Sequence, residues 1–246
     1  MALIEQIDKK KLPKHIAITM DGNGRWAQQK GKFRVFGHQN GVKAVRKTVE
    51  CAAEIGIQYL TLYAFSTENW GRSKKEVNAL MTLLISTINK ETKTLMDNDI
   101  RLHAIGDLEQ LPKKCKEELK DAIEKTKKNK RMTLILALSY SGRWEIINAI
   151  RNIVKDVKAK ELESELTEVI FRQYLSTKNV PDPELLIRTS GEHRISNFLL
   201  WQIAYSELYF TSTLWPDFRE EDLINAIIDY QKRVRRFGKS EKQIKN

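Results

Sequence analysis

The sequence Met20-Asp21-Gly22-Asn23-Gly24-Arg25-Trp26-Ala27 follows directly on the apolar run Ile16-Ala17-Ile18. We expect a short buried strand, about His15 to Met20, to end here and a helix to begin around Gly22 to Arg25, because the glycines mark a turn. Ligands of open α/β sheets bind outside the carboxyl ends of the strands, and the N–H groups at a helix N-terminus attract an anion. Asp21 repels that anion unless a cation lies between them. The stretch therefore predicts a phosphate group bound together with a divalent metal.

The composition is that of a soluble globular protein, with 246 residues, of which 41% are hydrophobic and 30% charged. We expect a single domain over residues 1–246, with residues 1–12 and 240–246 as flexible ends. The 43 Lys and Arg residues against 32 Asp and Glu give a net charge of +11, which attracts anionic partners, although solvated helix surfaces explain much of it. Two isolated cysteines and the lack of an apolar signal segment lead us to expect a cytoplasmic protein.

Apolar runs typical of strands alternate with longer helical patterns, which predicts an α/β fold with a mostly parallel six-stranded sheet flanked by helices. Ser73 is expected to be the N-cap of the helix that follows it, with Glu76, three residues on, as its capping-box partner. Strands are expected at about 15–20, 57–65, 100–106, 132–138, 185–188 and 208–211, and helices at about 41–55, 73–88, 113–128, 143–158, up to 175, 197–204 and 220–236.

Two nucleotide-binding motifs match only in part. Gly22-x-Gly24-x-x-Ala27 fits the dinucleotide fingerprint, but His38-Gln39-Asn40 stand where the ribose-binding acid is required. Gly238-Lys239-Ser240 resembles the end of a P-loop, but Arg233 occupies the position of its first glycine. We therefore expect neither a dinucleotide-binding fold nor a P-loop fold.

Polar residues gather after the first, second and fifth predicted strands. The carboxyl ends of parallel strands lie on one side of a sheet, so these clusters can converge. Guanidinium groups suit bidentate phosphate contacts, and their number indicates more than one phosphate. The arginines concerned are Arg25, Arg34, Arg72, Arg188 and Arg194.

The segments HIAITMDGNGRWA, GKFRVFGHQNG, YAFSTENWGR and RTSGEHRISNFLLWQIAYSELYFTSTLWPDF occur in this order and closely resemble the cis-prenyltransferases, in particular the bacterial undecaprenyl diphosphate synthases. The resemblance runs from about residue 13 to 238. It implies a homodimer with a hydrophobic tunnel beside the sheet. It also implies a Mg²⁺-dependent reaction that extends farnesyl diphosphate with isopentenyl diphosphate through Z double bonds. The implied product is a long-chain polyprenyl diphosphate, most plainly undecaprenyl diphosphate, a precursor of the cell-wall lipid carrier. Phe33 departs from the many relatives with proline there.

The resemblance also implies residue roles. Asp21 and Glu207 match metal ligands, and Asn69 matches the group near the condensing carbons. The proton acceptor stays open between Asp21, a diphosphate oxygen and a relayed water. The residues implied to bind or shield the substrates are Gly22, Asn23, Gly24, Arg25, Trp26, Arg34, His38, Ser66, Thr67, Glu68, Trp70, Arg72, Arg188, Arg194, Ile195 and Ser196.

Other readings stay open from sequence alone. The product could be shorter or longer, or the chain could be a non-catalytic polyprenyl-binding partner subunit, although such a subunit is expected to lack the metal carboxylate. Glu207 could be an ordinary surface acid. Nucleic-acid binding rests on charge alone and is not expected, whereas a greasy product implies peripheral membrane contact. One helix carries an apolar stripe that comprises Val77, Leu80, Met81, Leu84, Ile85 and Ile88. The stripe either belongs to the plain core or lines the tunnel, and in the second case Ala64, Phe65, Leu136 and Leu138 share the lining.

Overall fold

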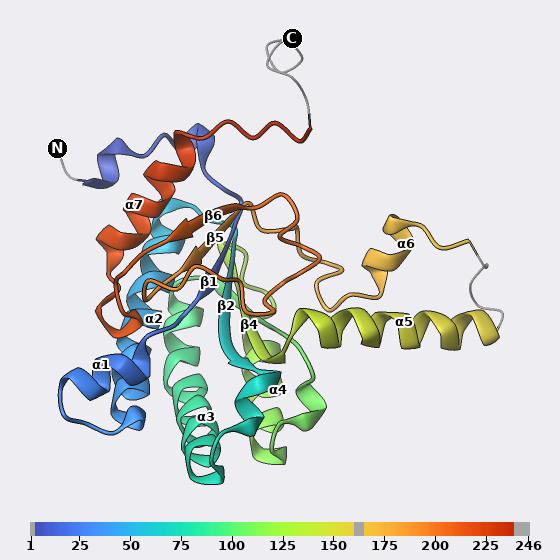
Figure 1. Ribbon diagram of the computed structural model, residues 1–246, viewed down its shortest axis with the longest axis horizontal. Coiled ribbons are helices and arrows are strands. Elements are labelled where there is room, and N and C mark those ends of the chain that lie inside the picture. The colour runs from blue at the N-terminus through green and yellow to red at the C-terminus, as the bar shows by residue number, and fades with distance from the viewer. Residues whose placement is uncertain (1–2, 160–164, 239–246) are drawn as a thin grey trace.

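A six-stranded sheet in the order β3-β4-β2-β1-β5-β6 forms the centre of the computed structural model, which describes residues 3–159 and 165–238 (Figure 1). Every strand pair is parallel, so the predicted α/β fold is confirmed. The strands are β1 (His15–Thr19), β2 (Tyr59–Ser66), β3 (Ile100–Ile105), β4 (Met132–Tyr140), β5 (Leu185–Arg188) and β6 (Glu207–Phe210).

The helices lie between these strands along the chain. Most of them are longer than three turns, and single 3₁₀ turns occupy the connections. The helices are α1 (Asn23–Gln29), α2 (Arg34–Ile55), α3 (Lys74–Asp97), α4 (Lys113–Thr126), α5 (Gly142–Lys158), α6 (Glu168–Gln173) and α7 (Glu220–Gln231), and the 3₁₀ turns are η1 (Leu3–Gln6), η2 (Lys9–Lys11), η3 (Thr67–Gly71), η4 (Leu108–Gln110) and η5 (Trp215–Asp217).

The two faces of the sheet are covered differently. Ile16 and Ile18 of β1 belong to the main core, which α2, α3, α4 and α7 complete. Ala17 faces the other side, where Phe198 and Leu199 of an irregular segment cover the sheet. All five residues of β1 are buried, as expected for a parallel strand covered on both faces. Helices α5 and α6 extend outward from this body with a small apolar cluster of their own (Figure 1).

Helix α2 begins at Arg34, whereas the sequence predicted a start at Gly41, so that boundary was wrong. The reason is a close approach between helices. A Cβ atom at Gly37 would lie 1.9 Å from the carbonyl oxygen of Asn23, and one at Gly41 would lie 2.4 Å from Asn23 Oδ1. Both glycines thus sit inside the helix so that α1 can pack against it, although glycine in a helix interior usually signals a break.

Two further predictions differ from the structure. The residues 197–204 form successive turns and no helix, with positive φ angles at Asn197 and Leu199. Helix α7 ends at Gln231, before the predicted Arg236. By contrast, Ser73 caps α3 as predicted, because its hydroxyl accepts the N–H of Glu76 at 3.3 Å. The Glu76 side chain does not complete the predicted capping box, since it pairs with Arg72.

The N-terminal residues pack on the body. Leu3, Ile7 and Leu12 contact the main core, and the Asp8 N–H donates to the side chain of Gln231 at 3.1 Å. The predicted flexibility of residues 1–12 stays a prediction, and the predicted flexible end at 240–246 lies outside the described residues.

Candidate functional site

Asp21 lies just beyond β1, at the carboxyl edge of the sheet. Its backbone is fixed by Thr189, whose hydroxyl accepts the Asp21 N–H at 2.9 Å and donates to the Asp21 carbonyl at 2.7 Å. The carboxylate accepts the Gly22 N–H through Oδ1 at 2.7 Å, and its Oδ2 lies 3.0 Å from Nη2 of Arg188. With its side chain 34% exposed, Asp21 is both anchored and accessible to a ligand.

The guanidinium groups of Arg25 and Arg188 lie 3.7 and 3.0 Å from Asp21 Oδ2. Together with Arg194 and Ser196, they form what we call the Arg188 cluster. Arg188 is only 4% exposed, and its Nη1 donates to the carbonyl of Arg194 at 2.5 Å and to Ser196 Oγ at 2.7 Å. Glu192 pairs with Arg25 at 3.1 Å and also with Arg194. The cations therefore outnumber the carboxylates here, which favours an anionic ligand.

A second basic group, which we call the Arg72 cluster, comprises Arg34, His38 and Arg72 around the carboxylate of Glu76. Arg72 Nη1 lies 3.1 Å from Glu76 Oε1, and Arg34 Nε lies 4.0 Å from it. Burial lowers the pKa of His38 to about 4, and the positive charges of Arg72 and Arg34 contribute to the shift. His38 is therefore neutral at pH 7, and the charge of the cluster comes from its arginines.

Gly24 allows Arg34 to lie against the start of α1. A Cβ atom at Gly24 would lie 2.8 Å from Arg34 Nε and would push the guanidinium away. The first N–H groups of α1 come after Gly22, which has a φ of 108° in the left-handed region. Two glycines thus bring backbone donors and a guanidinium together at one point, the arrangement that the sequence predicted for an anion.

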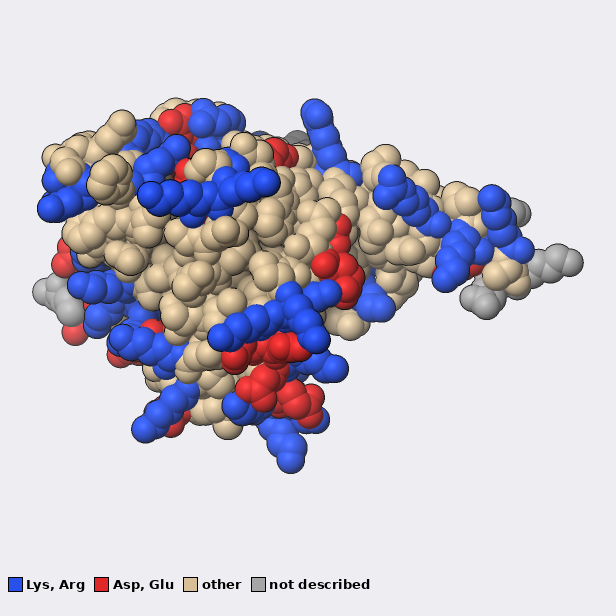
Figure 2. Space-filling view, turned by 90° about the horizontal axis from the view of Figure 1, so that it is seen from below, with Lys and Arg blue, Asp and Glu red and all other residues tan. Residues whose placement is uncertain are grey.

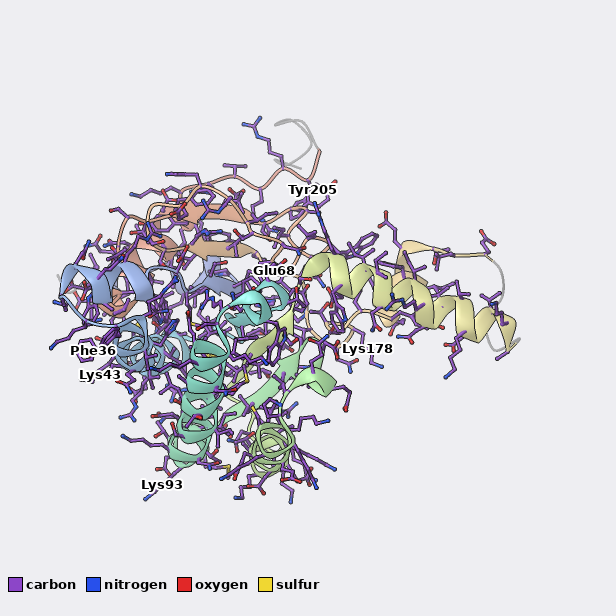
Figure 3. The ribbon with its side chains drawn as sticks, turned by 60° about the horizontal axis from the view of Figure 1, so that its bottom comes forward. Phe36, Lys43, Glu68, Lys93, Lys178 and Tyr205 are labelled. Atoms are coloured by element: carbon purple, nitrogen blue, oxygen red, sulfur yellow. The ribbon has the colours of Figure 1, made fainter. Side chains whose placement is uncertain are left out.

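The turn after β2 carries Asn69, whose carbonyl accepts the N–H of Arg72 at 3.1 Å. Asn69 Oδ1 accepts the Ser66 N–H at 3.1 Å in a capping box, which fixes the amide side chain. Glu68, on the turn next to the start of α3 (Figure 3), accepts a hydrogen bond from Asn197 Nδ2 at 2.7 Å. Although burial opposes the change, this hydrogen bond lowers the pKa of Glu68. The contact joins the loop after β2 to the loop after β5.

An apolar cavity of about 240 Å³ begins at the Arg72 cluster. His38, Asn69 and Arg72 line one end, and residues up to Leu95 line the other. Leu80 and Leu95 are separated along α3 by about 22 Å of helix. The apolar lining residues include Val42, Val45, Val49, Leu62, Ala64, Phe65, Leu80, Met81, Leu84, Ile88, Leu95, Leu134, Leu136 and Leu138.

Most of the residues predicted for the tunnel line this cavity, with two exceptions. Among the described residues, Val77 and Ile85 belong to the packed core of the same face and not to the lining. An ion pair interrupts the apolar wall between α2 and α3, where Arg46 Nε donates to Glu91 Oε2 at 2.9 Å. This pair is the point where the two walls of the cavity are linked by charge.

Both tryptophans expected to shield the reaction are engaged elsewhere. Trp26 is 8% exposed and stacks on Phe36, with ring centroids 5.8 Å apart. Trp70 packs edge-on against Phe65 and donates its N–H to Ser139 at 2.9 Å. Neither is among the described residues that line the cavity.

Glu207 is the predicted site residue that the chain does not bring to the site. It is the first residue of β6 and pairs with Leu185 at the start of β5, so it lies at the amino edge of the parallel sheet. Asp21 lies at the carboxyl edge, beyond the position where Thr19 pairs with Arg188. Glu207 instead binds Arg233 at 3.0 Å. Ile195 packs on the second face of the sheet beside Phe198.

Residues that could hold a metal are few. No group of three or more His, Cys, Asp or Glu side chains suited to a metal ion occurs among the described residues. The carboxylate of Asp21 contacts both the Arg188 cluster and the N–H of Gly22 at the start of α1. Because Mg²⁺ commonly uses one or two carboxylates plus phosphate oxygens and water, the donor set fits Mg²⁺ only when a phosphate group supplies further ligands.

Sequence reasoning missed three residues that organise the site. Thr189 fixes the backbone of Asp21, Asn197 joins the loops, and Glu76 balances the charge of the Arg72 cluster. Glu192 was foreseen as an ion-pair partner of Arg188 or Arg194, and it pairs with Arg194. Asn197 and Thr189 carry a faint signal, since both belong to the polar run after β5. The sequence signal of Glu76 was misleading, because the residue was interpreted as a capping partner of Ser73 and therefore not considered as part of the site.

The comparisons with known proteins agree with this geometry. A family model described as putative undecaprenyl diphosphate synthase matches residues 19–238. The chain is 55% identical to an isoprenyl transferase of Chlorobaculum tepidum, over 95% of this chain and 89% of that protein. It is 51% identical to a farnesyl-diphosphate-specific ditrans,polycis-undecaprenyl-diphosphate synthase of Haemophilus influenzae, over 96% and 99% of the two chains.

Solved structures with the same fold include lavandulyl diphosphate synthase from Lavandula x intermedia in complex with dimethylallyl diphosphate. Its TM-score is 0.91 at 39% identity, covering 94% of this chain and all of that one. A probable undecaprenyl diphosphate synthase from Campylobacter jejuni has a TM-score of 0.78 at 36% identity, covering 92% and 99%.

Proposed function

The chain belongs to the undecaprenyl diphosphate synthase family of prenyltransferases, and on this premise we propose that it condenses isopentenyl diphosphate units onto farnesyl diphosphate to give undecaprenyl diphosphate. Each new double bond has Z geometry. The relatives in Haemophilus influenzae and Pasteurella multocida carry this activity in their names. We propose one cis-prenyltransferase domain acting in the cytoplasm, whose product is a precursor of the cell-wall lipid carrier.

One observation carries the proposal: two arginine clusters lie at the carboxyl edge, and among the described residues the Arg72 cluster contributes to the lining of the apolar cavity whereas the Arg188 cluster does not. The Arg72 cluster lines the mouth of this cavity through His38 and Arg72. We assign the allylic diphosphate to it, with the prenyl tail in the cavity, where each buried CH₂ contributes about 0.8 kcal/mol. We assign isopentenyl diphosphate to the Arg188 cluster, whose described residues do not line this cavity.

The condensation needs a diphosphate to leave, and its developing negative charge must be stabilised. Arg34 and Arg72 can do this from fixed positions, together with the first N–H groups of α1. Asp21 would hold Mg²⁺ against the diphosphate, and the ion would supply Lewis-acid stabilisation of the leaving group. Arg188, whose Nη2 lies 3.0 Å from Asp21 Oδ2, would bind a diphosphate beside this carboxylate.

Asn69 is placed to orient the reacting ends of the two substrates, because it lines the cavity and its Oδ1 is held by Ser66. Its free amide N–H groups can donate to a diphosphate oxygen. An amide is a poor base, so the proton that leaves the condensed chain goes to Asp21, to a diphosphate oxygen or to a relayed water. Neutral His38 can donate one hydrogen bond to the allylic diphosphate.

We propose a homodimer, for which an apolar stripe on α5 gives support. Ile147, Ile150, Val154 and Val157 are each at least 36% exposed and recur at helical spacing on one side of α5. A second copy also bears on Glu207. Within one chain Glu207 and Asp21 lie at opposite edges of the sheet, so Glu207 can act as a metal ligand only at the site of a partner.

The test is incubation with farnesyl diphosphate, labelled isopentenyl diphosphate and Mg²⁺, with the extract separated by chromatography. We expect a labelled polyprenyl product of undecaprenyl length, lost on addition of EDTA and restored by excess Mg²⁺. A shorter or longer product would keep the chemistry and correct the length. No labelled product from folded protein would favour a polyprenyl-binding partner subunit.

A further inference from the structure

The connection between α1 and α2 exposes a large aromatic side chain. Phe33 is 90% exposed, the highest value among the exposed large apolar residues of the described chain. Phe36, in the first turn of α2, stacks on Trp26 and is 37% exposed. Lys30 and Lys32 flank Gly31 at the turn before Phe33. A single exposed apolar residue needs no explanation, but an aromatic one at a cationic loop tip does.

The chain around this tip contains cations and no carboxylates. No Asp or Glu occurs from residue 22 to 49. The same stretch contains seven cations, namely Arg25, Lys30, Lys32, Arg34, Lys43, Arg46 and Lys47. Figure 2 shows the underside of the molecule, where Lys and Arg side chains lie among Asp and Glu side chains.

Three of these cations have no carboxylate partner in the described chain, and one of them, Lys30, places its Nζ over the Trp26 ring at 4.7 Å from the centroid. Arg46 pairs with Glu91, and Lys47 lies 3.4 Å from Glu220. No carboxylate in residues 3–159 or 165–238 forms an ion pair with Lys30, Lys32 or Lys43.

Lys43 follows Phe36 by two helical turns, and the two side chains project from the same outer side of α2 (Figure 3). The cavity-lining residues Val42, Val45 and Val49 occupy a different side of the helix. We call Lys30, Lys32, Phe33, Phe36 and Lys43 the α1–α2 tip.

We propose that the α1–α2 tip is a membrane-contact surface, in which Phe33 inserts at the headgroup–acyl boundary of an anionic bilayer while the lysines bind the lipid phosphates. Stable attachment at an interface takes an apolar insertion and an electrostatic attraction together, and the tip supplies both. Within the described chain no helix combines the length and apolar content that crossing a bilayer requires, so the contact is peripheral.

The tip also has a useful position. Arg34, the residue after Phe33, belongs to the Arg72 cluster at the mouth of the cavity. Contact at Phe33 would therefore bring this mouth close to the lipid surface. The inference rests on the exposed side chains and charges of the tip, and it holds whatever prenyl chain the cavity accepts.

The experiment is co-sedimentation of the full chain with vesicles. We expect binding to vesicles of equal parts phosphatidylcholine and phosphatidylglycerol, weaker binding in high salt, and little binding to phosphatidylcholine alone. Phe33→Ser should weaken binding about tenfold or more, since it removes the aromatic ring that the bilayer would bury. Serine is favoured at an N-cap, the position of Phe33 before α2, so this variant should fold.

Matched controls separate the tip from general surface effects. Lys30→Gln with Lys32→Gln should weaken binding about tenfold, whereas Lys113→Gln with Lys120→Gln removes the same charge from α4 and should change it little. Val169→Ser removes an apolar side chain that is 70% exposed on α6 and should also change it little.

A second measurement uses Phe33→Trp. Its emission, taken as the difference from wild type, should shift to shorter wavelength with anionic vesicles and be quenched by brominated lipids. The proposal is overturned if wild type does not bind anionic vesicles, if Phe33→Ser binds like wild type, or if the controls lose as much. It is equally overturned if the tip variants lose binding to a mixed-sequence DNA duplex but not to vesicles.

Discussion

Replacing Asp21 with asparagine tests the two partners that we assign to its carboxylate. In the free protein Asp21 compensates the charge of Arg188, whose side chain is only 4% exposed. Asparagine keeps an Oδ1 acceptor for the N–H of Gly22 but presents no charge to Arg188. The variant therefore keeps the shape of the turn and removes the ion pair together with the proposed metal ligand.

The expected loss of stability follows from the exposure of the pair. A hydrogen bond to a charged group contributes about 1.5–3 kcal/mol, and the partial exposure of Asp21 places the loss near 2 kcal/mol. For a chain of this size that lowers Tm by about 4–8 °C. Turnover should fall by at least about a hundredfold, because the variant lacks the carboxylate proposed to hold the ion that stabilises the leaving diphosphate.

Thermal unfolding without substrate and labelled isopentenyl incorporation with Mg²⁺ measure the two effects. Asp182→Asn is the matched control, because Asp182 is 37% exposed and pairs at 3.0 Å with Arg172, which is 44% exposed. An exposed pair contributes about 0–1 kcal/mol, so the control should unfold near the wild-type temperature and keep its turnover. Near wild-type turnover in Asp21→Asn would refute the metal assignment, and an unchanged Tm would refute the ion-pair argument.

Three other variants or conditions test separate parts of the account. Arg194→Ala should raise KM for isopentenyl diphosphate about tenfold or more and raise KM for the allylic substrate less; steady-state kinetics with each substrate varied checks this, and the reverse ranking would move Arg194 to the allylic site. Leu136→Trp should shorten the products, because Leu136 lines the cavity; an unchanged length distribution would return it to the plain core. Burial lowers the pKa of His15 to about 4 from 6.5, so the folded state binds fewer protons and the stability from this group, present above pH 6.5, is lost as the pH falls toward 4. The loss is about 3 kcal/mol, and denaturant unfolding should show a shallower pH dependence for His15→Gln than for wild type.

The sheet was predictable because its strands are buried on both faces and therefore appear as continuous apolar runs such as Ile16-Ala17-Ile18. The start of α2 was not, because Gly37 and Gly41 have the signature of a turn until α1 is known to pack against them. The segment 197–204 was predicted as a helix for a similar reason. Phe198 and Leu199 are buried because they cover the sheet, and not because they share the apolar face of a helix.

The site divides along a similar line. The arginines could be grouped from sequence, because parallel strands bring their carboxyl ends together. Which arginine pairs with which carboxylate depended on rotamers and loops, as Glu76 and Glu192 illustrate. Glu207 was placed by resemblance alone, and only the sheet register reveals that the start of a strand lies at the edge away from Asp21. The ring contacts of Trp26 with Phe36 and of Trp70 with Phe65 were not evident from spacing, and the shielding role of both tryptophans stays a prediction.

The stereochemistry of the product tests the central claim most directly. The purified chain is incubated with farnesyl diphosphate, isopentenyl diphosphate and Mg²⁺, and the dephosphorylated product is analysed by mass spectrometry and carbon-13 NMR. We expect a long polyprenol whose E double bonds come only from the farnesyl primer and whose added units are all Z. Added units with E geometry, or no extended product from folded protein, would contradict it.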